Sequence, residues 1–234
     1  AVEAQHRVST LKLVDNLAEQ RVLEELIETS KPPVPPECRH LDYLLYTPFR
    51  YAAYPQGSRF RRAGMTEGVF YASERAKTAV AEMVFYRLLF FAESPATPWP
   101  TNAAEYTAFA VEYRTGKALD LTVAPLDADR PLWTDPVDHS HCQALAETAR
   151  RASVAVIRYA SVRDPHQGVN LALLTCRAFA KPRPVARQSW RIFLRASGAQ
   201  AICEAPWAGL NFDKASFARD PRIASLDWDR PQKA

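Results

Sequence analysis

Glycine is scarce in this chain: only 7 of its 234 residues are glycine, less than half of the usual share of roughly 7%. The glycines lie at positions 57, 64, 68, 116, 168, 198 and 209. No set of them has the spacing of a dinucleotide-binding G-x-G-x-x-G or of a phosphate-binding G-x-x-x-x-G-K. The sequence therefore argues against a Rossmann oxidoreductase and against a P-loop nucleotidase.

Long apolar runs and paired cysteine motifs are also missing. The longest apolar stretch, 83–92, is interrupted by Arg87 and is shorter than the roughly 18 residues of a membrane span. The start of the sequence has no secretory apolar region. The four cysteines, Cys38, Cys142, Cys176 and Cys203, are far apart and form no C-x-x-C pair. We therefore expect a cytoplasmic protein with reduced thiols and no membrane partner.

The charge is balanced, with 30 basic and 26 acidic residues and a net charge of +4. This mild excess favours anions such as phosphates. No stripe of alternating basic and aromatic residues is present, so we expect no direct binding of nucleic acid. Apolar residues make up 47% of the chain, enough for a substantial core.

The first 36 residues read as a helical arm and a linker. Residues 9–30 carry leucines at three- and four-residue spacings after the possible cap Ser9. The proline-rich run 31–36 must end this helix, because proline lacks the amide donor. We expect an arm at 1–36 and a catalytic domain at 37–234. The arm either packs on its own domain or docks on a partner or a second copy, which makes a homo-oligomer one of the alternatives.

The rest of the chain alternates β-prone runs with few helices. A long helix is predicted at 75–91, where Ala79, Met83, Tyr86 and Phe90 share one face and Glu82 lies beside it. A second helix is predicted at about 139–151. Strands are predicted at 44–46, 49–51, 69–72, 107–112, 118–121, 154–159, 171–174, 190–194 and 200–203. This order indicates an α+β fold rather than a doubly wound sheet.

Two common kinds of catalytic site find little support. His139 and His141 have no second ligand pair nearby, so we expect no metal. The nucleophile motif G-x-S-x-G of a Ser-His-Asp hydrolase is also missing.

Six short motifs follow one another in a fixed order. They are T-P-F-R-Y at 47–51, G-S-R-F-R-R at 57–62, G-V-F-Y-A-S at 68–73, A-E at 81–82, R-Y-A-S-V-R at 158–163 and G-V-N at 168–170. In this order the sequence resembles the RES-domain family over about residues 41–205. It departs from the family at Ser58 and Arg61, where many members have glycine and asparagine, and in its long N-terminal arm.

The resemblance implies the toxin of a bacterial type II toxin–antitoxin pair, with NAD as its substrate. It implies an ADP-ribosyltransferase-like fold, a mixed β-sheet core with flanking helices. Family members cleave NAD at the nicotinamide–ribose bond, and they pass ADP-ribose to a protein such as a nucleotide-biosynthesis enzyme, or to phosphate or water. It also implies a cognate antitoxin that covers the active site. A non-enzymatic partner-binding module on the same fold is the rival interpretation.

The chemistry of NAD cleavage suggests roles for seven residues. Positive charge develops on the ribose as the bond breaks, so a nearby carboxylate stabilises the transition state, and Glu82 is the candidate. The fork-shaped donors of Arg50 and Arg59 suit the pyrophosphate, with Arg61 as a third. Ser161 can bind a ribose or orient Glu82, and it has no adjacent base to make it a nucleophile. The last two candidates, for stacking on the nicotinamide, are Tyr71 and Tyr51, and strand tyrosines also commonly fill a core.

Overall fold

The computed structural model describes residues 10–51, 55, 57–64 and 67–231. Its helices and short helical turns are α2 (Leu17–Ser30), η1 (Pro36–Cys38), α3 (Tyr43–Arg50), α4 (Ala76–Ala92), η2 (Leu126–Asp129), α5 (Arg130–Trp133), α6 (Ser140–Arg151), η3 (Cys176–Ala178) and α7 (Pro221–Ala224). Its strands are β1 (Phe70–Ser73), β2 (Ala104–Ala110), β3 (Ala118–Asp120), β4 (Val156–Ala160), β5 (Val169–Leu173), β6 (Ala186–Arg195), β7 (Gly198–Glu204) and β8 (Trp207–Asp213). The fold is α+β, as predicted.

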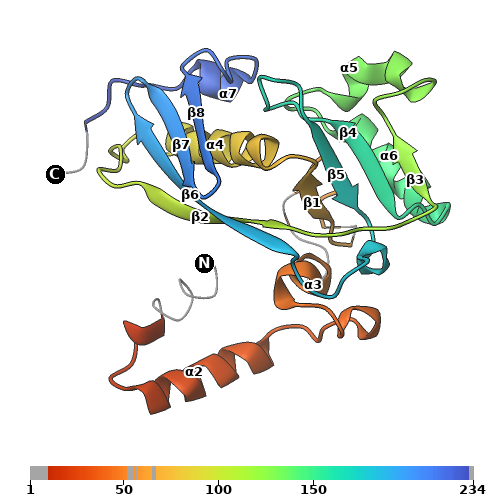
Figure 1. Ribbon diagram of the computed structural model, residues 1–234, viewed down its shortest axis with the longest axis horizontal. Coiled ribbons are helices and arrows are strands. Elements are labelled where there is room, and N and C mark those ends of the chain that lie inside the picture. The colour runs from red at the N-terminus through yellow and green to blue at the C-terminus, as the bar shows by residue number, and fades with distance from the viewer. Residues whose placement is uncertain (1–9, 52–54, 56, 65–66, 232–234) are drawn as a thin grey trace.

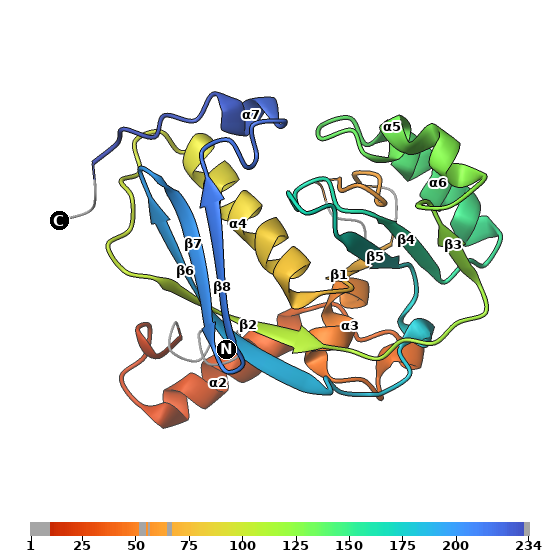
Figure 2. The same cartoon turned by 45° about the horizontal axis from the view of Figure 1, so that its top comes forward.

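The strands form two four-stranded sheets with the long helix α4 between them (Figures 1 and 2). The first sheet has the order β1-β5-β4-β3 and is mixed, because β3 and β4 are parallel and its other pairs are antiparallel. The second sheet, β2-β6-β7-β8, is antiparallel throughout. The long α4 packs its Val84, Phe85 and Leu88 into one core with Trp190 and Ile192 of the second sheet.

The first sheet is covered on both faces, which explains its nearly continuous apolar sequence. Along β5, Leu171 and Leu173 pack with the residues of α3, whereas Ala172 packs on the other side with the residues of α6. Successive strand residues point to opposite faces, so a strand buried on both faces has no polar alternation. The sequence run 171–174 was therefore recognised as a strand by its apolar content alone.

The first two predicted strands, 44–46 and 49–51, are wrong. The chain forms the helix α3 there, and Arg50 is its last residue instead of a strand residue. Asp42 caps this helix by accepting a hydrogen bond from the backbone N–H of Leu44 at 2.9 Å. The buried Leu45 anchors the helix in the core. Capping and packing outweigh the β propensity of the tyrosines and phenylalanine, which measures fit to a pleated surface.

The helix predicted at 9–30 is interrupted at 12–16, and its long part, α2, begins only at Leu17. The other predicted elements are present within a few residues, and β8 is an additional strand that the sequence analysis did not identify. Its residues alternate between exposed and half-buried or buried positions along the outer edge of the second sheet. Within the described part of the chain, no helix is both long and apolar enough to cross a membrane.

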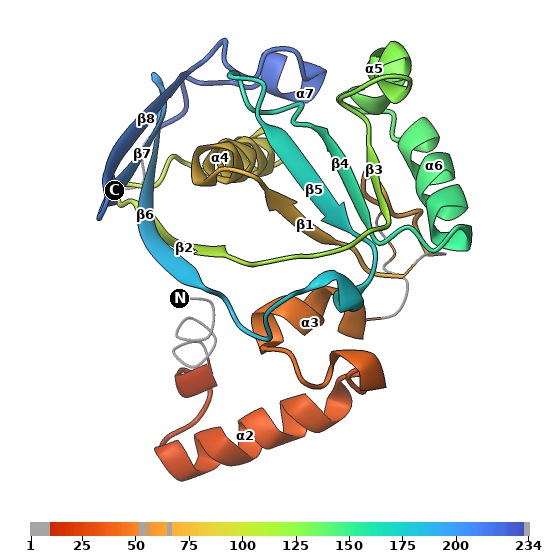
Figure 3. The ribbon, with the colours of Figure 1, turned by 45° about the vertical axis from the view of Figure 1, so that its right-hand side comes forward.

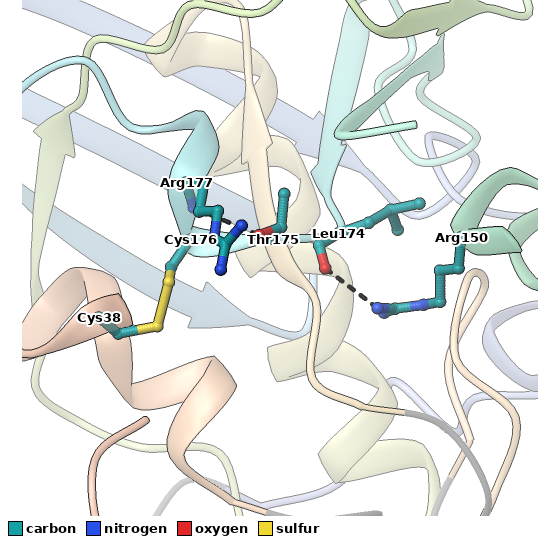
Figure 4. The surroundings of a disulfide bond; sticks show 6 residues. All are labelled: Cys38, Arg150, Leu174, Thr175, Cys176 and Arg177. Atoms are coloured by element: carbon teal, nitrogen blue, oxygen red, sulfur yellow. Dashed lines mark hydrogen bonds between the residues drawn. A yellow bond between two sulfur atoms is a disulfide. The ribbon is translucent and has the colours of Figure 1, made fainter. Parts of the chain in front are cut away.

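The expectation of four reduced thiols is wrong, because Cys38 and Cys176 form a disulfide (Figure 4). Their Cα atoms lie 5.9 Å apart although 138 positions separate them in the sequence. The bond joins η1, before α3, to η3, directly after β5. Cys142 and Cys203 remain free and buried. Spacing along the chain could not reveal this pair, because only the packing of α3 against the first sheet brings the two cysteines together.

The N-terminal arm is helical and lies outside the two sheets (Figures 1 and 3). Its main helix, α2, begins after Asn16, whose side chain accepts hydrogen bonds from the backbone N–H groups of Ala18 and Glu19. The predicted cap Ser9 lies outside the described residues. Val22 and Leu26 are 55% and 62% exposed. Most of the arm's large apolar side chains therefore do not pack on the domain that follows.

Candidate active site

A cavity of about 700 Å³ opens between the two sheets, with α4 along one wall. Residues of β1, β2, β5 and β6 supply most of the other walls. Its volume falls in the range of sites that enclose small molecules and cofactors. From α4, Ala79, Met83 and Tyr86 line it together with Glu82. Three of the four residues of the helix face that the sequence analysis identified therefore line the cavity beside Glu82, whereas Phe90 is not among them.

Glu82 is held in place through one of its two carboxylate oxygens. Its Oε1 accepts a hydrogen bond from the Ser161 hydroxyl at 2.6 Å and another from Asn170 Nδ2 at 2.6 Å. Its Oε2 accepts no hydrogen bond from the residues that the structure describes. The carboxylate thus has a fixed orientation and one oxygen available to a ligand in the cavity.

The two side chains that hold Glu82 are themselves fixed from neighbouring strands. Ser161 follows β4 and accepts a hydrogen bond from the backbone N–H of Asp164 at 3.0 Å. Asn170, on β5, accepts a hydrogen bond from the Ser73 hydroxyl of β1 at 2.6 Å. Both Ser161 and Asn170 are buried. Four elements of the fold therefore set the position of one carboxylate.

Gly168 permits the close approach that this network needs. A Cβ atom at this position would lie 2.1 Å from Thr78 Oγ1 of α4 and 2.4 Å from an oxygen of Asp164. Any larger residue would push the start of β5 away from α4. The glycine of the G-V-N motif is thus explained by packing, and its asparagine by the bond to Glu82.

Tyr71 lines the cavity from β1. Its hydroxyl lies 2.8 Å from Ser58 Oγ and accepts a hydrogen bond from the backbone N–H of Phe60 at 3.0 Å. Burial of this hydroxyl raises the pKa of Tyr71, so the phenol stays neutral. Tyr71 ties the turn at 57–62 to β1 and still presents part of its surface to the cavity.

Arg59 also contacts the cavity, but its guanidinium already has partners. It is only 5% exposed, and its two Nη atoms donate to the backbone oxygens of Trp133 and Asp135 at 2.8 Å each. Both contacts are neutral carbonyl groups. Arg59 therefore anchors the segment after α5 and brings a positive charge to the cavity wall. Its assignment to the pyrophosphate stays a prediction.

Ser161 does not line this cavity itself and reaches it through its hydrogen bond to Glu82. The structure does not bring the other three predicted residues to it. Arg50 donates to Glu28 Oε1 at 2.6 Å and to the backbone oxygen of Pro32 at 2.5 Å, so it joins α3 to the arm. Tyr51 is the C-cap residue that follows α3. The backbone of Arg61 pairs with that of Ser58 across the tight turn that carries Arg59. None of the three is among the described residues that line the cavity.

Two residues that the sequence analysis did not assign to the site, His139 and Arg163, line the cavity as well. Burial and the nearby guanidinium groups of Arg59, Arg163 and Arg222 lower the pKa of His139 to about 4. This imidazole is therefore neutral at neutral pH. No signal in the sequence could place it here, because His139 lies 47 positions after the last residue of α4, Ala92. Asn170 also lines the cavity and was not assigned to the site. In its case the G-V-N motif at 168–170 could have indicated a site residue.

Among the described residues, no group of three or more His, Cys, Asp or Glu side chains is arranged to hold a metal ion. His139 and His141 therefore gain no further ligand from the fold within that part of the chain.

Comparison with known proteins gives one family. The family model described as RES domain matches residues 34–195, which is more than half of the chain. The match begins in the linker after α2 and ends at the last residue of β6. It includes Glu82, Ser161 and Asn170. No curated protein matches the sequence.

Proposed function

Because the chain belongs to the RES-domain family, we propose that it cleaves NAD at the bond between nicotinamide and ribose. The RES domain is consistent with a toxin or NAD-processing family. The observation that carries the finer proposal is the carboxylate of Glu82, held by Ser161 and Asn170 at the wall of a cavity large enough for a cofactor-sized ligand.

The proposed chemistry needs a negative charge at a fixed position. When the C–N bond to nicotinamide breaks, its electron pair leaves with the nicotinamide and positive charge develops on the ribose. A preorganised carboxylate stabilises that charge, and it does so more strongly in the transition state than in the ground state. Glu82 has this role in our proposal. Ser161 and Asn170 act as positioning residues, because they contact the carboxylate.

The proposal keeps five residues for NAD binding, although only some of them line the cavity: Arg50, Arg59, Arg61, Tyr51 and Tyr71. Tyr71 and Arg59 line it, so they support binding directly. Arg50, Tyr51 and Arg61 require the arm or the turn at 57–62 to rearrange around the dinucleotide. We place Tyr71 and Arg59 first for these reasons.

We propose a protein as the acceptor of ADP-ribose, with phosphate and water as the alternatives. In this proposal the chain is the toxin of a toxin–antitoxin pair that acts in the cytoplasm. A cognate antitoxin silences it by covering the cavity. The half-exposed apolar side chains of Met83 and Tyr86 at this cavity support the assignment of a covering protein.

Incubation of the purified chain with NAD and chromatography of the products test the proposal. We expect free nicotinamide from the wild-type chain and little from Glu82→Gln. The NAD carries a label in its ADP-ribose part, and the reactions contain buffer alone, added phosphate or added protein. Labelled ADP-ribose would identify water as the acceptor, labelled ADP-ribose 1-phosphate would identify phosphate, and label retained on the added protein would identify a protein. Absence of free nicotinamide in all three reactions would reject the enzyme and favour the non-enzymatic binding module.

A further inference from the structure

A second, smaller cavity of about 200 Å³ lies behind Ser161. Three arginines line it: Arg163 follows β4, Arg130 begins α5, and Arg219 precedes α7. Ser161 lines this cavity and donates its hydroxyl to Glu82. Arg163 lines both cavities. The smaller cavity is therefore polar and lies next to the residues that position Glu82.

Arg163 is a buried cation that forms no ion pair with any carboxylate of the described residues. Arg163 is only 7% exposed, and its guanidinium carbon lies 4.5 Å from the centre of the Phe85 ring. One Nη atom donates to the backbone oxygen of Pro136 at 3.0 Å. Its Nε is buried and has no hydrogen-bond partner among the described residues. Burying an unpaired charge of this kind destabilises the fold unless something compensates it.

The two carboxylates at this cavity are engaged elsewhere. Asp164 accepts hydrogen bonds from the Thr78 hydroxyl at 2.8 Å and from the backbone N–H of His166 at 2.9 Å. Asp220 accepts two hydrogen bonds from the side chain of Arg222. Neither forms an ion pair with Arg163 in the described part of the chain. Burial opposes the change, but the hydrogen bonds from Arg222 and the charge of Arg163 lower the pKa of Asp220, so this carboxylate compensates Arg163 at longer range without a direct contact.

The other two arginines also keep donors available. Arg219 is exposed, and its side chain forms no hydrogen bond or ion pair with the described residues. Arg130 donates only to the side-chain oxygen of Gln167, at 3.2 Å. A guanidinium group has five N–H donors in a planar fork that suits oxyanions. Three such groups line this small cavity, and their donors match the oxygens of a tetrahedral anion in chemistry and charge.

We propose that this smaller cavity is an oxyanion site that binds a phosphate group through Arg163, Arg219 and Arg130. The anion would compensate the buried charge of Arg163 and accept hydrogen bonds that the protein does not supply. Two sources share this chemistry: free inorganic phosphate, and a phosphate group of a bound dinucleotide. The site itself does not depend on the identity of the substrate, so the proposal goes beyond NAD cleavage.

Calorimetric titration of the full-length chain with inorganic phosphate, at constant ionic strength set with chloride, tests the site. We expect binding to the wild-type chain and an affinity at least tenfold lower in Arg163→Met and in Arg219→Gln. The matched control is Arg195→Gln, which removes an exposed arginine of β6. The control should bind phosphate as the wild type does.

Melting temperatures provide a second readout. Phosphate should raise the melting temperature of the wild-type chain and of Arg195→Gln, and it should leave that of Arg219→Gln unchanged. In buffer without phosphate, Arg163→Met should melt no lower than the wild type, because an unpaired buried charge is removed. If Arg163→Met fails to fold, Arg219→Gln decides alone, because its side chain is exposed. A wild-type chain that binds no phosphate, or variants that bind it equally well, would overturn the proposal.

Repeating the titration in the presence of NAD distinguishes the sources. Competition between NAD and phosphate would assign the site to a phosphate group of the dinucleotide. Simultaneous binding would assign it to free phosphate. Both results support the oxyanion site, and failure of NAD to be cleaved would leave the phosphate titration unaffected.

Discussion

Glu82 receives both of its hydrogen bonds on the same oxygen, and this asymmetry decides what a substitution there does. The side chains of Ser161 and Asn170 fix Oε1, so Oε2 is the oxygen left for a ligand. A glutamine at this position can keep an oxygen toward the two donors while it loses the negative charge. The residue therefore allows the charge to be tested separately from the packing.

We predict that Glu82→Gln lowers the rate of nicotinamide release by about 10²–10³, because preorganised electrostatic contacts at reacting centres have effects of that size. NAD affinity should change less than the rate, since the developing charge exists chiefly in the transition state. Nicotinamide chromatography, calorimetry with NAD and the melting temperature are measured on one preparation.

The control for this substitution is Glu93→Gln, at the exposed end of the same helix. It should behave as the wild type in all three measurements. Turnover that is unaltered in a folded Glu82→Gln chain would remove Glu82 from the mechanism, whereas a large drop in melting temperature would assign it a structural role.

His139 gives the stability a pH dependence whose sign follows from its low pKa. Its pKa is about 4 in the folded chain, compared with the ordinary value of 6.5 that applies to the unfolded chain. The unfolded chain therefore binds a proton first as the pH falls. The stability that this group contributes is complete above pH 6.5 and is lost progressively toward pH 4.

We expect His139→Gln to flatten the decline in melting temperature between pH 6.5 and pH 4, compared with the wild-type chain. His141→Gln, which changes an exposed histidine two positions later, should leave that decline as it is. Melting curves in buffers of matched ionic strength measure both. Parallel pH profiles for the wild type and His139→Gln would show that other groups cause the decline.

At the scale of elements, the disulfide between Cys38 and Cys176 joins two short helical turns on the α3 side of the first sheet. One turn leads into α3, and the other follows β5, which carries Asn170. The bond closes a long loop, and in the chain-entropy account a long loop restricts the unfolded chain strongly. It stabilises the sheet from which Glu82 is positioned.

Reduction of this bond should lower the free energy of unfolding by about 2–5 kcal/mol, the usual cost of losing a native disulfide. Thermal melting with and without a phosphine reductant measures the change. The double variant Cys38→Ser/Cys176→Ser should melt at the lower temperature in both conditions. A reductant effect that persists in the double variant would assign the change to another cause.

At the scale of the whole molecule, the N-terminal arm carries several large apolar side chains that are exposed to solvent. Val22 and Leu26 lie on α2 and are mostly exposed, while Arg50 joins the arm to α3 through Glu28 and Pro32. Exposed apolar side chains on one helix favour association with another surface. The prediction that the arm docks on a partner or on a second copy therefore remains open to a direct test.

We expect the full-length chain to form an oligomer in light scattering and the Val22→Ser/Leu26→Ser variant to have a lower mass. Nicotinamide release should stay nearly intact, because α2 contributes no residue to the cavity among those described. Glu25→Ser, on the same helix, serves as the control and should keep the wild-type mass. A monomeric wild-type chain would reject the second copy and leave an unrelated partner as the occupant.

The sequence by itself determined the fold class and the long helix that carries Glu82. It did so because strand content, helical periodicity and the order of the six motifs are local properties of the chain. Ser161 and Tyr71 were named as candidates because each belongs to a short motif, whereas their partners Glu82 and Ser58 lie outside those motifs. The helix α3 was missed because a cap and one buried leucine outweighed the β propensity of its residues.

Only the tertiary structure decided which side chains meet. It joined Cys38 to Cys176, brought Asn170 to Glu82, and placed His139 and Arg163 at the cavity while directing Arg50 to the arm. Arg50 and Glu28 are 22 positions apart, Asn170 and Glu82 are 88 apart, and the two cysteines are 138 apart. Contacts across such separations depend on how two sheets and a helix pack, and no local pattern of residues encodes that packing.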